Sequence, residues 1–70
     1  MDYVEIITAE VRKRSASGVP LSALNNFNEK DFPGVDFKEM CEVLKSRGYI
    51  KKTYIRSFCL EDAVIEDILS

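Results

Sequence analysis

Basic side chains are the residues of this chain best suited to chemistry, and the chemistry they suit is electrostatic binding of phosphate. Four of them fall in a stretch without any acidic residue, and they are Arg47, Lys51, Lys52 and Arg56. Three more follow one another near the N-terminus, at Arg12, Lys13 and Arg14. Lysine and arginine contact nucleic-acid phosphates, and Tyr49 and Tyr54 lie among these basic residues, Tyr54 either as an exposed contact or as part of the core. The sequence therefore predicts a phosphate-tracking surface.

Both basic groups also have a purely structural interpretation. Positive charge on the last turn of a helix complements the helix dipole, which would explain residues 12–14. Lysines on an exposed hairpin edge keep that edge from pairing with other chains, which would explain Lys51 and Lys52. The net charge of −2 gives no global signature of a nucleic-acid binder, so binding would have to come from local charge.

The residue types argue against an enzyme. The chain has no histidine, and its two cysteines, Cys41 and Cys59, cannot by themselves complete a four-ligand zinc site. It also has no glycine-rich phosphate loop and no nucleophile with a partner base. We therefore expect no catalytic residue, no bound metal and no cofactor. Both cysteines are expected to be small apolar residues, although a disulfide between them is geometrically open.

Length and hydropathy indicate one small domain over residues 1–70. Hydrophobic residues make up 46% of the chain and charged residues 31%, which is an ordinary globular balance. No run approaches the roughly 18 apolar residues of a membrane span, and the N-terminus lacks the layout of a signal peptide. We expect an intracellular protein, cytoplasmic or nuclear, with no membrane partner.

The element that would position the basic groups is a helix over residues 36–47. Asp36 and Glu39 have the spacing of a capping box, and Gly48 provides a left-handed stop. An apolar stripe at i, i+3, i+4 and i+7 would face the core, formed by Phe37, Met40, Cys41 and Leu44. The exposed side would carry Lys38, Glu39, Glu42, Lys45 and Ser46. Because this helix sums to zero charge, it is a mediocre reader of a nucleic-acid groove.

The remaining pattern predicts three further helices and one hairpin. Apolar spacing favours helices over residues 3–14, 22–28 and 61–69, with a short extended segment or edge strand at 19–21. Residues 49–53 and 55–60 are rich in strand formers and predict two strands, with the reversal near 52–53 or 56–57. The last helix is acidic and is expected to pack on the first.

This order of elements resembles the winged helix-turn-helix superfamily. Residues 18–24 look like the first strand and second helix of such domains, and residues 44–50 look like their third helix running into strand two. A fainter similarity, in residues 19–24 and 32–37, is to the LOTUS or OST-HTH variant of RNA-associated germline proteins. The resemblance implies a mainly α fold with a small β-hairpin (α+β), a scaffold that hosts nucleic-acid binders and protein-interaction modules.

Two functions follow from this resemblance. The first is a small DNA-binding, transcription-associated protein whose partner is duplex DNA. Its expected contacts are Arg12, Lys13, Arg14, Lys38, Lys45, Ser46, Arg47, Lys51, Lys52 and Arg56. The second is a protein-protein interaction module of a larger assembly, docking through the mixed-charge helix or the acidic C-terminal helix. A homodimer could form through Ile65, Ile68 and Leu69 if core packing leaves them free.

Overall fold

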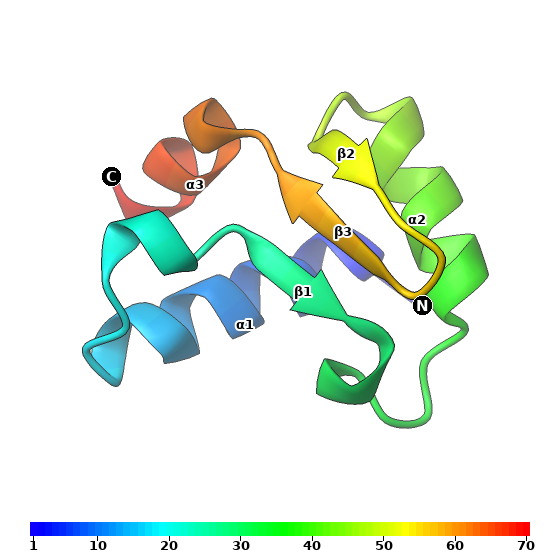
Figure 1. Ribbon diagram of the computed structural model, residues 1–70, viewed down its shortest axis with the longest axis horizontal. Coiled ribbons are helices and arrows are strands. Elements are labelled where there is room, and N and C mark those ends of the chain that lie inside the picture. Colours follow the sequence, from blue (N-terminus) through cyan, green and yellow to red (C-terminus); the bar gives the residue numbers. More distant parts are fainter.

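A three-stranded antiparallel sheet lies across one side of the protein, with helix α1 passing behind it and α2 and α3 at its two sides (Figure 1). This computed structural model describes all residues, 1–70. The helices are α1 (Tyr3–Ala16), α2 (Phe37–Ser46) and α3 (Asp62–Leu69), and the strands are β1 (Asn26–Asn28), β2 (Ile50–Thr53) and β3 (Ser57–Leu60). Two 3-10 helices flank β1, η1 (Leu21–Ala23) and η2 (Glu29–Asp31). The expected α+β class is confirmed.

The three α-helices begin and end within two residues of their expected positions, and local side chains cap the N-termini of α1 and α2. The Asp2 carboxylate accepts a hydrogen bond from the Glu5 N–H, and the Asp36 carboxylate accepts one from the Glu39 N–H, both at 3.1 Å. Gly48 ends α2 at φ +75°, a conformation that glycine adopts without steric cost. The expected packing of the last helix on the first is also observed between α3 and α1.

The expected helix over residues 22–28 is wrong. Only the single turn of η1 forms there, and the chain then extends into β1, which pairs with β3 in the register Asn26 to Cys59 and Phe27 to Phe58. Asparagine competes with the helix backbone for hydrogen bonds and so disfavours helix interiors. Pairing with β3 buries Phe27 to 1% exposure, which a short isolated helix could not do. The helix that would precede α2 in a helix-turn-helix is therefore missing.

The third strand of the sheet is β1 and not the extended segment or edge strand expected at residues 19–21, whereas the β2–β3 hairpin is confirmed. Its reversal centres on Ile55 and Arg56, closer to the second of the two expected positions, with the Tyr54 N–H donating to the Ser57 carbonyl at 2.8 Å. A register shift between Ile50 and Lys52 interrupts the pairing of β2 with β3. A bulge of this kind increases the local twist of the edge strand.

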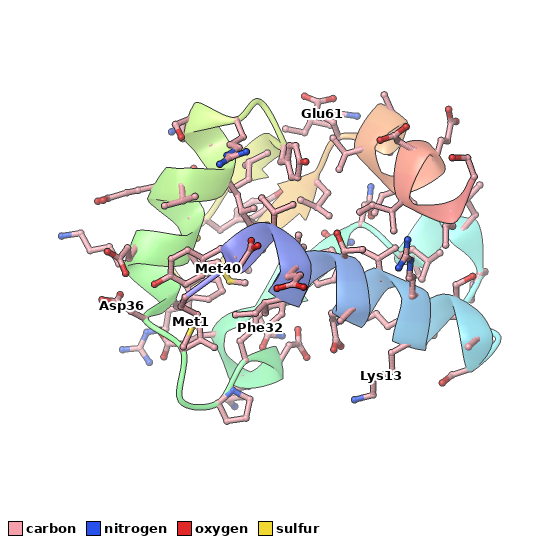
Figure 2. The ribbon with its side chains drawn as sticks, turned by 180° about the vertical axis from the view of Figure 1, so that it is seen from behind. Met1, Lys13, Phe32, Asp36, Met40 and Glu61 are labelled. Carbon is pink, nitrogen blue, oxygen red and sulfur yellow. The ribbon has the colours of Figure 1, made fainter.

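The core centres on four phenylalanines, and the helices close it from behind. The rings of Phe27, Phe32, Phe37 and Phe58 form a cluster with centroids 5.5 to 6.5 Å apart. The helices add buried side chains, chiefly Ile7, Val11, Met40, Leu44 and Ile65. The apolar stripe expected on α2 therefore faces the core, with Cys41 half-buried at its edge. Figure 2 shows Met40 and Phe32 in this interior.

Replacement of Leu44 by alanine should unfold a large part of the protein. Leu44 is fully buried, so Leu44→Ala removes apolar contacts and leaves a cavity that costs about 2 to 5 kcal/mol, a large fraction of the stability of a small domain. Urea unfolding followed by circular dichroism would measure the loss. Ile55→Ala is the control, because Ile55 is 97% exposed and its loss should leave the unfolding midpoint unchanged. Equal midpoints for wild type and Leu44→Ala would contradict the core packing.

Candidate nucleic-acid interface

A cleft of about 370 Å³ lies between α2 and the tip of the β2–β3 hairpin. One face of α2 forms its first wall, with Phe37, Lys38, Cys41, Glu42 and Lys45. The hairpin forms the second wall with Thr53, Tyr54 and Ile55, and Glu29 of η2 lies at the edge. The α2 residues are three or four positions apart, which is the spacing of one helix face. The cleft therefore brings Lys38 and Lys45 beside the hairpin.

The three basic side chains of the hairpin are free to bind. Lys51, Lys52 and Arg56 are all exposed, and none of them forms an ion pair. The Lys52 ammonium lies 5.5 Å from the centroid of the Tyr54 ring, which places charge and aromatic surface together. A short hairpin thus presents three unneutralised cations within six residues of the sequence.

The tip of the hairpin also exposes apolar surface. Tyr54 is 53% exposed and Ile55 is 97% exposed, so neither contributes much to the core. Tyr54 was expected among the basic residues from the sequence, whereas Ile55 was not expected to be part of this surface. The only signal for it is an isoleucine in a reversal that lacks the usual turn residues, where a polar side chain would normally face water.

The other expected contacts lie elsewhere on the surface. Arg12 and Lys13 are exposed near the end of α1, and Figures 1 and 2 show this end on the far side of the molecule from α2 and the hairpin tip. The Ser46 hydroxyl donates to the Val43 carbonyl at 2.7 Å. Arg47 borders a second cleft beside Met1 and the start of α1. The structure therefore gathers Lys38 and Lys45 with the hairpin and separates the rest.

The side chain of Arg14 is bound by other residues of the protein. Its guanidinium pairs with the Glu10 carboxylate at 3.2 Å and the Asp31 carboxylate at 2.9 Å, and it donates to the Asn26 carbonyl at 2.5 Å. The same group lies 4.3 Å from the centroid of the Phe27 ring. Arg14 thus joins α1 to β1 and η2, and each of its three nitrogens already has a partner within the protein.

Removing the Arg14 charge should destabilise the fold, whereas removing its neighbour's charge should not. Arg14→Met keeps most of the side-chain volume but breaks charge-assisted hydrogen bonds, with an expected loss of about 1 to 3 kcal/mol of unfolding free energy. Arg12→Met is the matched control on the same helix, and because Arg12 is exposed and unpaired its change should stay within about 0.5 kcal/mol. Chemical denaturation of both variants would decide. Equal losses would show that Arg14 holds nothing together.

Near its N-terminus, α1 is joined to α2 by a side-chain hydrogen bond between Tyr3 and Glu39. The Tyr3 hydroxyl donates to the Glu39 carboxylate, and Glu39 does not accept from the Asp36 N–H, so the capping box expected from the sequence is only half formed. The bond to the Glu39 carboxylate, reinforced by desolvation, raises the pKa of Tyr3 to about 12. Ionisation of Tyr3 would remove this donor and place two negative charges together.

This contact predicts a loss of stability in strongly alkaline solution. The pKa of Tyr3 is higher in the folded protein than the ordinary value of 10.0, so its stabilising contribution is complete below pH 10 and disappears as the pH rises towards 12. Absorbance of tyrosinate, compared between wild type and Tyr3→Phe, isolates this one hydroxyl. A midpoint of the difference titration near 10 would mean that the Tyr3–Glu39 hydrogen bond does not form.

Both cysteines are free and half-buried, as expected for small apolar residues rather than a disulfide. Desolvation raises the pKa of the Cys41 thiol, and the nearby Glu42 acts in the same direction. A raised pKa lowers the fraction of reactive thiolate at neutral pH. The Cys59 thiol donates to the Asn26 side-chain oxygen at 2.8 Å on the outer face of the sheet.

The C-terminal helix leaves little of the surface expected for a dimer. Ile65 is 2% exposed and belongs to the core, and Ile68 is half-buried against it. Only Leu69, at 37% exposure, remains open among the three residues.

No helix of the structure is both long enough and apolar enough to cross a membrane.

Comparison with known proteins adds no relative. No family model, curated protein or solved structure matches this chain. The α+β class therefore stands on the structure itself, and the function must be argued from the chemistry of the surface.

Proposed function

We propose that the protein binds nucleic acid through the β2–β3 hairpin and the adjoining face of α2, a pairing related to the wing and third helix of winged helix-turn-helix domains. The observation that carries this proposal is the set of three exposed, unpaired cations on one hairpin, Lys51, Lys52 and Arg56. Cations of this kind gain affinity by releasing counterions from phosphate, so they act without any sequence-specific geometry. Lys38 and Lys45 lie on the adjoining face of α2, where Glu29 and Glu42 of the same cleft offset their charge.

The distribution of charge supports this orientation. The acidic segment from Glu61 to Asp67 holds four carboxylates and no base. Figure 1 shows α3, which carries most of them, at the opposite corner of the molecule from the hairpin tip. A nucleic acid on the hairpin would therefore approach the positive side of a bipolar protein. A role in transcription is the broader function that fits such a module.

The geometry favours positioning by phosphate over reading of sequence. Glu42 stands between Lys38 and Lys45 on the face of α2 that borders the hairpin, so that face is not uniformly positive. The helix that normally precedes the reading helix is replaced by η1 and β1. Contacts to phosphate set register and orientation without distinguishing bases. We therefore propose weak sequence preference.

Binding should be lost steeply as salt rises and should depend on the hairpin lysines. Fluorescence anisotropy with labelled oligonucleotides would measure Kd between about 20 and 200 mM salt, where each phosphate contact contributes a slope of about 0.9 in log Kd against log salt on duplex and about 0.7 on single strands. Lys51→Glu combined with Lys52→Glu removes two contacts, so the slope should fall by about 1.4 to 1.8 and low-salt binding should be nearly abolished.

Arg12→Glu combined with Lys13→Glu is the matched control. It makes the same change in net charge on exposed residues at the other side of the protein, so it should weaken binding much less than the hairpin double variant. Equal losses from the two double variants would show that binding follows net charge and not the hairpin. Absence of any binding near 50 mM salt would contradict the nucleic-acid function itself.

A protein-interaction module is the second candidate, favoured by a different cleft. Leu21, Ser22, Asp62, Ile65 and Glu66 surround about 400 Å³ between η1 and α3. Leu21 is 59% exposed there, beside two carboxylates. An apolar anchor with an acidic rim suits a basic segment of a protein partner. Loss of a partner in Leu21→Asp, with nucleic-acid binding absent, would favour this function.

A further inference from the structure

We infer that the nucleic acid is single-stranded and that one unstacked base enters the cleft between α2 and the hairpin tip, against the ring of Tyr54. This inference rests on the proposed function and names its substrate class. Phosphate contacts alone do not account for the apolar surface at the hairpin tip. Tyr54 and Ile55 are exposed at the tip, between the hairpin cations in the sequence, and both line the cleft.

The charge inside the cleft distinguishes a base from a phosphate. Lys38 and Lys45 are offset there by Glu29 and Glu42, so the lining has no net charge. A phosphate would gain no net electrostatic attraction from this neutral lining, whereas an uncharged base does not need any. Carboxylates also accept hydrogen bonds from the amino groups of bases, which are accessible when a base is unpaired. The phosphates are therefore assigned to the hairpin cations outside the cleft.

The aromatic and apolar lining suits the face of a base. Tyr54 offers a ring at the mouth of the cleft, while Phe37 and Cys41 belong to the opposite wall. Stacking on an aromatic side chain is a sequence-tolerant way to hold single strands, because every base has a flat π face. In a duplex the bases are already stacked and paired, so a duplex could use the cations but not this cleft.

The positions of the cations match this arrangement. Lys52 lies within cation–π distance of the Tyr54 ring, and Arg56 follows Ile55 at the reversal. A base stacked on Tyr54 would thus bring the phosphates of its own and the next nucleotide near positive charge. Aromatic stacking flanked by cations that follow the backbone is the general arrangement for binding single strands.

The experiment compares one oligonucleotide of about 12 nucleotides, a length within the range of single-strand sites, with the same strand annealed to its complement. Anisotropy would give both Kd values for wild type, Tyr54→Ala and Tyr54→Phe at low salt. Wild type should bind the single strand more tightly. Tyr54→Ala should weaken single-strand binding about tenfold, within the range for loss of one stacked base, and leave duplex binding within about twofold. Tyr54→Phe keeps the ring and should resemble wild type.

Tyrosine emission gives a second readout, because the chain has no tryptophan. Stacking of a base on Tyr54 should quench part of the emission of wild type on addition of single strand, and Tyr54→Phe should lose that part. The half-exposed position of Tyr54 makes both variants compatible with folding, and thermal unfolding monitored by circular dichroism would verify it.

The outcomes separate this inference from the function on which it rests. If single strand and duplex bind equally, or if Tyr54→Ala leaves single-strand binding unchanged, the base-binding cleft is overturned while the nucleic-acid function stands. If neither form binds wild type at low salt, the proposed function fails first. Loss of both forms in the hairpin double variant, with selective loss of single strand in Tyr54→Ala, supports both.

Discussion

The stacking of Phe27 on Phe58 is the contact on which the rest of the structure depends. Their ring centroids are 5.5 Å apart and their planes differ by 22°, in a pair that is directly opposite in the β1–β3 register. This pair draws β1 into the sheet, and Arg14 covers the outer side of Phe27. Because buried aromatic pairs contribute beyond the area they bury, one contact can hold a strand of only three residues.

The same cluster fixes the candidate interface. Phe37, the first residue of α2, packs on Phe58 at 5.5 Å, so the start of α2 is tied to the middle strand of the sheet. The reversal of the hairpin lies just before Ser57 and Phe58 in the chain, and its residues Tyr54 and Ile55 are exposed and not covered by the core. Phe37 is thus shared between the core and the wall of the cleft. The cleft exists because the aromatic core ends before the hairpin does.

Most of the fold could be predicted because its signals are local. Asp36, Gly48 and the apolar stripe define α2 in the sequence alone, and the hairpin follows from two runs of strand formers. β1 could not be predicted, since its three residues acquire their conformation from a partner strand about thirty positions away. Of the candidate site, the hairpin cations could be recognised in the sequence as a run of basic residues without acids. That Arg14 has a structural role while Arg12 stays exposed could not, because it depends on contacts of Arg14 with Asp31 and Phe27.

Separation of charge along β3 would let a chain of net charge −2 attract phosphate at the hairpin, as proposed. Arg56 immediately precedes β3 and Glu61 immediately follows it, so four strand residues, about 13 Å at 3.3 Å each, separate Arg56 from the acidic segment that begins at Glu61. At physiological ionic strength charges are screened over about 8 Å, so a phosphate at the hairpin is attracted by the nearby cations and is little affected by α3. At much lower salt the screening length exceeds this spacing, and the acidic helix then opposes binding. The length of one strand therefore sets the range of salt concentration over which the two ends act independently.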